Sequence, residues 1–367
     1  MDSHMRNDLR LLSALFASSA LIQLIGCASP TTVAASGSNA AIQNEAIEQQ
    51  VLALTTTRDR LQRLQDLYWP LRRANTDLCG ESISLHSGFS FAQGADFGRI
   101  DLYPEQQQVV TRAFGVTDQV TAIYVTENAP AWKAGLRRGD QITAINGEAV
   151  GAGRNETRNL QRRLNDQVQG NAASYKLQIS RNGTPQTLNI TPEQVCSFEI
   201  ILDPSDALNA YADGSSIYIT SGMYRFVDTD QELQLVIAHE LAHNSEGHIN
   251  KKVGNSLLGG VFDIAAAVYG VNTGGFFGEI AGGMYSQEFE TEADYVGLYM
   301  MARADIATVE SANFWRRMAV ESPGNIKGSY SASHPATSER WVAIDAAERE
   351  ISGKQSAGQV LLPAREE

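Results

Sequence analysis

The chain has 367 residues, and its 42 acidic side chains outnumber the 29 basic ones, which gives a formal net charge of −13. This acidic balance argues against binding to nucleic acid and against charge-driven attachment to anionic lipid. Half of the six histidines fall in one short stretch, Val236–Asn250.

The N-terminus carries a short, mostly apolar run. Residues 11–25 follow Arg6 and Arg10 and precede Gly26 and Cys27. The length suits the core of a signal peptide and is short for a membrane span. A buried helix is the alternative, which the Gly, Ser, Pro and Thr residues directly afterwards disfavour.

The letters LIGC resemble a bacterial lipobox, which implies that residues 1–26 are removed and that Cys27 is acylated. Ala28 at the next position is compatible with sorting to the outer membrane. We therefore expect a Gram-negative lipoprotein on the periplasmic side of the outer membrane, attached through its lipid. Residues 27–41 then serve as a tether.

Leucines recur among polar residues between Ile42 and Asn75, which predicts a long amphipathic helix. Cys79 and Cys196 follow it and are the two cysteines that remain if Cys27 is acylated. An oxidising periplasm permits a disulfide between them, and two free buried thiols are the alternative.

The stretch between these cysteines resembles a PDZ domain of the bacterial kind. Val120–Val150 reads as a strand, a short helix and a second strand ending at an Asn-Gly hairpin turn. A helix is expected at 158–168, and another hairpin around Asn182-Gly183. The resemblance implies capture of a peptide or C-terminus by strand addition, with Ala113–Val116 as a candidate carboxylate-binding loop. A spacer that only positions the next domain is the alternative.

Downstream, Ile217 and Ile219 alternate with polar residues, as in a half-buried strand. We predict an exposed edge here that pairs with the substrate backbone, through Ser216, Ile217, Tyr218 and Ile219.

The helix that contains Val236–Asn250 brings two histidines onto one face. His243 lies about 40° from His239 around the helix axis, whereas His248 falls about 180° away and is expected to be structural. Glu240 follows His239 directly. This H-E-x-x-H spacing is typical of two Zn²⁺ ligands with a glutamate that acts as general base.

A catalytic zinc site normally has a third protein ligand. Glu246 is unsuitable, because it lies about 10 Å along the helix from His239. A distant acidic stretch offers candidates, with Glu288, Glu290, Glu292 and Asp294 at alternate positions. A solvated acidic face is the alternative. Residues 256–283 lie in between and are expected to form two helices or a lid over the cleft.

The pair of motifs His239–His243 and Glu290–Asp294 resembles metallopeptidase family 48, a gluzincin family. Asn209–Met223 and His334–Arg340 resemble two further elements of that family. The resemblance implies one Zn²⁺ per chain, held by His239, His243 and Glu290, with Glu240 as general base.

The resemblance also assigns roles to three residues outside the helix that carries His239 and His243. It implies that Asp294 orients a ligating histidine, that His334 lies near the metal and that Arg340 holds its own segment in place. Near the metal, His334 would either stabilise the oxyanion of the tetrahedral intermediate or occupy the open coordination position of the zinc ion. The helix at 42–75 resembles the family's first helix, so the PDZ-like module is expected to be inserted into the protease domain.

The expected fold is α+β: a mainly helical zincin-type domain with a small sheet, and an inserted β-rich module. The expected domains are a signal peptide (1–26), tether (27–41), first protease helix (42–78), PDZ-like insertion (79–196), metallopeptidase domain (197–350) and C-terminal tail (351–367).

The leading functional prediction is a zinc endopeptidase for misfolded or unassembled envelope proteins. A zinc-bound chaperone or adaptor with little or latent proteolysis is the first alternative. A structural zinc lipoprotein is the second.

Overall fold

The computed structural model describes residues 37–97, 104–153, 155–169, 174–251, 285, 287–321, 334 and 338–365. The predicted signal peptide, the acylated Cys27 and the expected lid at 256–283 lie outside these residues. Residues 47–367 form one compact unit. Within the described part of the chain, no helix combines the length and apolar character that crossing a membrane requires.

Helix α2 (Asn39–Ala74) is the long helix that the leucine pattern predicts. Its second half buries Leu64, Tyr68 and Leu71 in one hydrophobic core with the downstream helices, whereas Leu52 is 67% exposed. The hydroxyl of Tyr68 donates to the carbonyl of Phe198, although 130 residues separate the two. The second half of α2 therefore packs with the C-terminal domain.

The C-terminal domain contains a three-stranded sheet of order β10-β11-β9. Its strands are β9 (Glu199–Asp203), β10 (Ala210–Ala212) and β11 (Ser216–Thr220). β11 pairs in antiparallel fashion with β10 and in parallel fashion with β9.

The prediction of an exposed edge at Ser216, Ile217, Tyr218 and Ile219 is wrong, because both edges of β11 are paired. Alternating apolar and polar residues identify a strand but not its neighbours in the sheet. Among the described residues, the edges of this sheet are β9 and β10.

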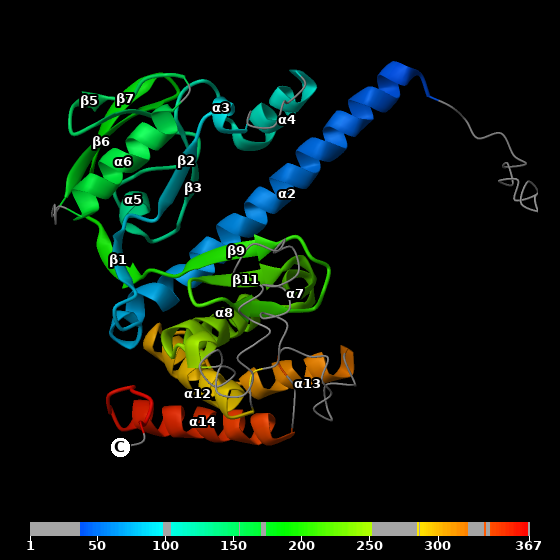
Figure 1. Ribbon diagram of the computed structural model, residues 1–367, viewed down its shortest axis with the longest axis vertical. Helices are drawn as coiled ribbons and strands as arrows, with labels where there is room; N and C mark the ends of the chain where they lie inside the picture. The colour runs from blue at the N-terminus through cyan, green and yellow to red at the C-terminus, as the bar shows by residue number, and fades with distance from the viewer. Residues whose placement is uncertain are drawn as a thin grey trace, which may run out of the picture. The chain divides into compact units, whose positions relative to one another are not determined.

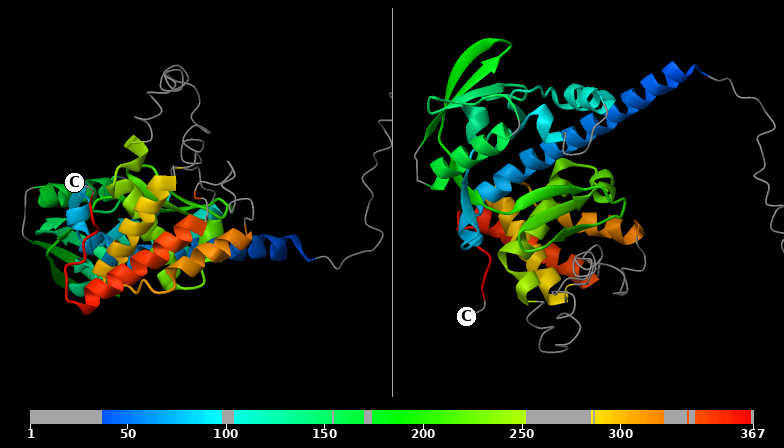
Figure 2. Two further views of the ribbon diagram at one scale, coloured as in Figure 1. Left: turned by 90° about the horizontal axis from the view of Figure 1, so that it is seen from below. Right: turned by 45° about the horizontal axis from the view of Figure 1, so that its top comes forward.

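Helices pack on one side of this sheet in layers. α8 (Asp230–Ser245) contacts β10 and β11, and α12 (Gln287–Arg303) packs against α8. α13 (Ser311–Glu321) and α14 (Ser338–Ser356) complete the helical side, as Figures 1 and 2 show. The short helix α7 (Ser221–Phe226) connects β11 to α8.

The module that precedes the C-terminal domain in the chain is rich in β-strands. Its main sheet has the order β2-β3-β4-β6-β7, with β5 paired to β4. The strands are β2 (Phe89–Ala92), β3 (Thr121–Val125), β4 (Gln141–Ile145), β5 (Glu148–Ala149), β6 (Tyr175–Arg181) and β7 (Thr184–Ile190). The helices are α3 (Gly94–Phe97), α4 (Pro104–Phe114), α5 (Pro130–Lys133) and α6 (Glu156–Gln169).

Both predicted hairpin turns are present in this module. Asn146 and Gly147 have φ values of 48° and 86°, and Asn182 and Gly183 have 51° and 79°. Positive φ at both central residues is the signature of a type I′ turn, which matches the twist of the flanking strands.

The helical C-terminal domain with its small sheet, together with the β-rich module, confirms the predicted α+β class.

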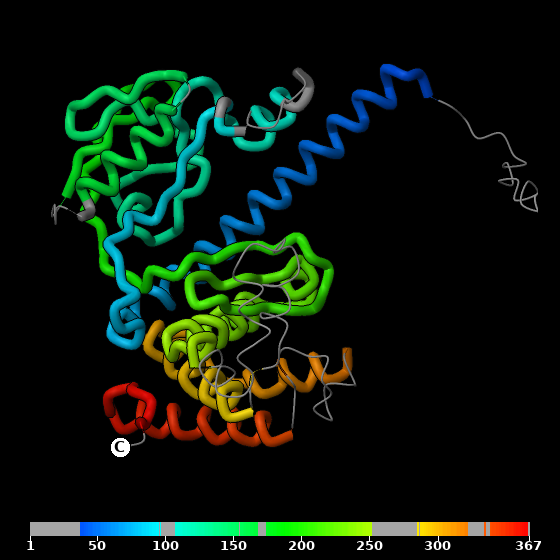
Figure 3. The backbone as a smooth tube through the Cα atoms, in the orientation of Figure 1, coloured from blue at the N-terminus to red at the C-terminus, as the bar shows by residue number. Residues whose placement is uncertain are grey.

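A two-stranded ribbon joins the chain entering this module to the chain leaving it. β1 (Ile83–His86) pairs with β8 (Glu193–Cys196) in antiparallel fashion, after the 3₁₀ turn η2 (Thr76–Leu78). Cys79 and Cys196 are joined by a disulfide with a Cα–Cα distance of 5.7 Å. Figure 3 traces this path from α2 through the β-rich module and back to β9.

Candidate metal centre

Helix α8 is defined at both ends by local chemistry. The Thr229 side chain accepts a hydrogen bond from the backbone N–H of Glu232 (3.2 Å), and Glu232 accepts one from the backbone of Asp228 (2.8 Å). This is a reciprocal N-terminal cap. Gly247, with φ of +65°, follows the last turn and breaks the helix. Residues 235–244 between these ends are all buried, so the histidines face protein rather than solvent.

His239 and His243 lie one turn apart with their Nε2 atoms 3.1 Å from each other. Both histidines are 1% exposed. The adjacent Glu240 is also 1% exposed. The spacing therefore places both imidazoles at one buried point, as expected from the helical repeat.

Helix α12 brings Glu290 to the same point. Its Oε2 lies 3.5 Å from Nε2 of His239, and its Oε1 lies 3.5 Å from Nε2 of His243. Gly297 permits this close packing of helices, because a Cβ at that position would lie 3.1 Å from the backbone of Ala238 and His239.

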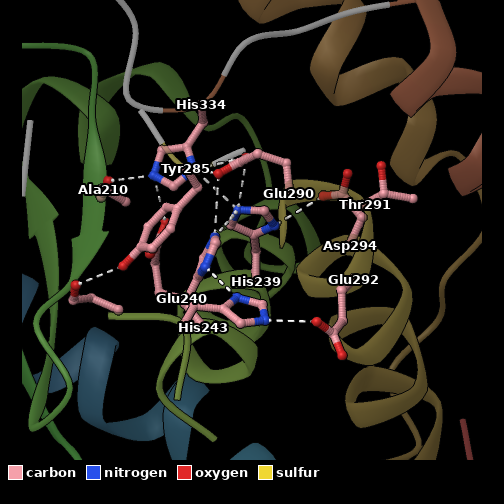
Figure 4. Close-up of polar contacts among 12 residues, drawn as sticks. Ala210, His239, Glu240, His243, Tyr285, Glu290, Thr291, Glu292, Asp294 and His334 are labelled. Atoms are coloured by element: carbon pink, nitrogen blue, oxygen red, sulfur yellow. Dashed lines mark hydrogen bonds and ion pairs between the residues drawn. The ribbon is translucent and has the colours of Figure 1, made fainter. Parts of the chain in front are cut away.

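His334 adds a third imidazole. Its Nδ1 lies 3.2 Å from Nε2 of His239 and 2.9 Å from Oε1 of Glu290. Its Nε2 donates to the carbonyl of Ala210 in β10 (3.1 Å) and lies 3.4 Å from Oε1 of Glu240. The candidate ligand atoms of His239, His243, Glu290 and His334 all lie within 4.8 Å of one another. Figure 4 shows these four side chains pointing toward one another.

The donor set suits a zinc ion. Three imidazole nitrogens and one carboxylate oxygen converge, and neutral imidazole and carboxylate are ordinary Zn²⁺ ligands. The second oxygen of Glu240, Oε2, is buried and has no hydrogen-bond partner among the described residues. Such an orphaned acceptor beside convergent ring nitrogens is costly without a cation or a water molecule. The residues present therefore fit one ion.

The electrostatics of the cluster separate its members. Burial lowers the pKa of His239, but the nearby carboxylates of Asp294 and Glu290 outweigh it and raise this pKa to about 10. Burial holds the pKa of His243 well below its ordinary value. Burial also raises the pKa of Glu240, which favours a carboxylate able to take up a proton.

The carboxylate of Glu290 behaves in the opposite way. Burial alone would raise its pKa, yet the charges of His334 and Arg340 and the hydrogen bonds of the neighbouring histidines hold it well below its ordinary value. Glu290 is therefore the anionic member of the cluster.

Asp294 and Arg340 contact the cluster residues: Asp294 contacts His239, and Arg340 contacts Glu290 and Asp294. Oδ1 of Asp294 lies 2.9 Å from Nδ1 of His239. Arg340, from α14, donates to both oxygens of Asp294 at 2.7 Å, and its Nη1 lies 2.9 Å from Oε2 of Glu290. Its guanidinium lies 4.2 Å from the ring centroid of Trp315. Arg340 thus does more than hold its own segment in place.

His248 lies beside the cluster, so the expectation that it points away from the pair is wrong. Its Nδ1 lies 2.8 Å from Nδ1 of His243, and its Nε2 lies 3.0 Å from Oε2 of Glu292. The helical projection failed because it continued past Gly247, where the chain turns back toward His243. The glycine was the signal that the projection could not extend further.

Tyr285 also lies against the cluster. Its ring stacks on His243 with a centroid distance of 4.1 Å and an interplanar angle of 19°. The sequence offered no signal for this contact, since aromatic residues recur throughout the chain.

A cavity of about 600 Å³ lies where the β-rich module meets α2 and β9, and β1 contributes three of its lining residues. Its lining also includes Ser90 from β2 and Gln161 and Asn165 from α6, together with Arg72 of α2 and Glu199 of β9. None of the residues Ala113–Val116 lines it, because they lie at the end of α4 and just beyond it. The role of Ala113–Val116 as a carboxylate-binding loop therefore stays a prediction.

Comparison with known proteins matches both parts of the chain. Residues 184–348 match Peptidase family M48, and residues 100–191 match the PDZ domain. The mitochondrial metalloendopeptidase OMA1 of Saccharomyces cerevisiae is 30% identical over 154 residues, covering 38% of this chain and 44% of that protein.

Two bacterial proteins are similar over stretches of comparable length. The beta-barrel assembly-enhancing protease of Yersinia pestis is 26% identical over 141 residues, covering 34% of this chain and 29% of that protein. The metalloprotease LoiP of Escherichia coli is 30% identical over 142 residues, covering 36% of this chain and 56% of that protein. The chain thus spans about half of these relatives or less. The C-terminal domain is therefore a peptidase family M48 domain, and the β-rich module before it is a PDZ domain.

Proposed function

We propose that this chain is a zinc-dependent endopeptidase of the bacterial cell envelope that cleaves misfolded or unassembled proteins. The observation that carries the proposal is the convergence of His239 and His243 from one buried helix with Glu290 from another, beside the buried Glu240. In this proposal the three converging residues hold the ion. Asp294 orients His239.

When bound, zinc supplies the Lewis acidity that lets a water molecule ionise near neutral pH. Glu240 takes the proton of the attacking water as the C–O bond forms. It then delivers that proton to the amide nitrogen as the C–N bond breaks, which releases a free amine and a carboxylate. The raised pKa of Glu240 suits both transfers.

We place the substrate on β10 rather than on β11. β10 is an edge strand in the part of the chain that the structure describes, and its Ala210 carbonyl accepts a hydrogen bond from Nε2 of His334. A peptide that adds to this edge would exchange that bond for main-chain hydrogen bonds and run past the cluster. Pairing through the backbone reads little of the side chains, so broad specificity for unfolded segments is expected.

The proposal gives the PDZ domain the task of recognising peptides or C-termini, and makes residues 79–196 an insertion in the protease domain. The place of β2 at an edge of the sheet, among the described residues, supports the first point, since strand addition needs an edge that a peptide can reach. The packing of α2 with the C-terminal core supports the second. The name of the beta-barrel assembly-enhancing protease agrees with an envelope role, and the LIGC sequence supports acylation of Cys27 in the outer membrane.

A second candidate function is a zinc-holding adaptor with latent proteolysis. His334 favours it, because its Nδ1 lies among the other candidate ligands and would close a site that catalysis needs open.

The proposal is tested with an unfolded substrate such as casein. Its cleavage by the native chain is compared with its cleavage by Glu240→Gln, and the zinc content of both proteins is measured. Cleavage by the native chain alone, with zinc in both proteins, supports the endopeptidase. Zinc in both without cleavage by either supports the adaptor.

A further inference from the structure

We propose that His248 and Glu292 form a relay that positions His243 for metal binding. The inference rests on the zinc site of the proposed function and adds two residues to it. His248 and Glu292 touch the metal only through His243, so they are positioning residues rather than ligands.

The relay is a continuous chain of short contacts. Nδ1 of His243 lies 2.8 Å from Nδ1 of His248, and Nε2 of His248 lies 3.0 Å from Oε2 of Glu292. His248 is fully buried and its ring stacks on Phe289 at a centroid distance of 4.7 Å. The ring is therefore fixed in orientation by packing as well as by its polar partners.

The carboxylate determines where the protons lie. A carboxylate only accepts, so Nε2 of His248 carries a proton that it donates to Glu292. The neutral ring of His248 then has a bare Nδ1, which accepts the proton of Nδ1 of His243. That leaves Nε2 of His243 without a proton and with its lone pair directed at His239 and Glu290.

The same logic applies directly to the other histidine, since Asp294 lies 2.9 Å from Nδ1 of His239. Glu290, Glu292 and Asp294 alternate along α12, and the middle one lies about 160° to 200° around the helix from the other two. Glu292, the middle residue, contacts the cluster through His248. The helix break at Gly247 turns His248 back toward α12. The alternation thus gives one candidate ligand and two orienting carboxylates.

The two orienting carboxylates differ in exposure. Asp294 is buried and paired with Arg340. Glu292 has a side chain that is 36% exposed and lies 4.0 Å from Lys251. Removing the charge of Glu292 therefore perturbs the fold less than removing that of Asp294, which makes Glu292 the better position to test.

The test measures zinc affinity of the full-length, metal-free chain by competition with a chromophoric chelator. Glu292→Gln and His248→Phe should each weaken zinc binding by about 10- to 100-fold, the usual effect of losing such an outer partner. Glu288→Gln is the matched control, because it removes one acid from an exposed position on the same helix and should change affinity less than about twofold. His248→Gln, whose amide oxygen can accept from His243, should recover part of the loss.

Ring nitrogen NMR of histidine-labelled, zinc-loaded protein gives a second reading that packing alone would not change. Native protein should show His243 protonated at Nδ1 and His248 protonated at Nε2. Glu292→Gln should lose the preference at His248.

Zinc affinities of Glu292→Gln and His248→Phe equal to that of Glu288→Gln would overturn the relay. So would the opposite tautomer at His248. A relay-dependent zinc affinity in a chain that cleaves no protein would leave the relay standing and remove only the endopeptidase.

Discussion

The guanidinium of Arg340 lies between two helices, with its Nη1 2.9 Å from Oε2 of Glu290. Both side chains are 1% exposed. Arg340 also binds Asp294, so one buried cation compensates two buried carboxylates. The contact ties α14 to the metal cluster, and the first prediction follows from it.

Arg340→Ala removes one of the two buried cations beside Glu290 and Asp294, and leaves protonated His239 as the other. We expect the free energy of unfolding of the metal-free chain to fall by about 3–5 kcal/mol, as for other broken buried pairs. Added zinc should recover part of this loss, because it binds the folded state only. Denaturant titrations with and without zinc measure both effects.

Arg349→Ala is the matched control on the same helix. Arg349 pairs with Asp345 one turn away, and its side chain is 67% exposed. Exposed pairs of this kind contribute about 0.5 kcal/mol or less. Equal stability of the two variants without zinc would contradict the bridging role.

Zinc binding should release about one proton at neutral pH. The pKa of His239 is raised to about 10 by Asp294 and Glu290 against the effect of burial. His239 is therefore protonated in the metal-free chain below this pKa and must lose that proton to bind. Zinc affinity should accordingly fall as the pH is lowered. Calorimetry in buffers with different heats of ionisation counts the protons.

Asp294→Asn provides the comparison, because it removes the first of the groups that raise the pKa of His239. Fewer protons should be released from this variant. Identical proton release from both proteins would refute the assignment of the proton to His239.

His334→Ala should raise the rate of casein cleavage several-fold while zinc remains bound. Nδ1 of His334 sits among the candidate ligands, and its removal opens a coordination position for water and substrate. Initial rates at equal zinc content measure the effect. A lower rate would instead assign His334 to the oxyanion.

Much of the cluster was predictable because it depends on local helical spacing. The four-residue repeat places His239 and His243 together whatever surrounds them, and the resemblance to the family supplied Glu290 and Asp294. The structure brings these four residues together, and their roles remain predictions for the experiments above.

The errors arose where non-local information was needed. Alternation in Ser216–Thr220 predicted a strand, yet strand neighbours are set by β9 and β10, which come from separate segments. His248 was assigned to the wrong side because a glycine ended the helix one residue earlier. A one-dimensional pattern contains neither the pairing partners nor the direction of the chain after a break.

Replacing Cys79 with Ser should lower the free energy of unfolding by about 4–5 kcal/mol under oxidising conditions. The bond to Cys196 closes a loop of 117 positions in the unfolded chain. Under reducing conditions the native and variant chains should unfold alike. Thiol titration of the native chain that finds both cysteines free would rule out the bond.

The most direct test of the zinc site is an anomalous difference map, recorded at the zinc absorption edge from crystals of the full-length chain. We expect one peak, at about 2.0–2.2 Å from Nε2 of His239, Nε2 of His243 and a carboxylate oxygen of Glu290. A zinc-loaded crystal with its only peak elsewhere, or with Glu290 outside bonding distance of the ion, would contradict the account.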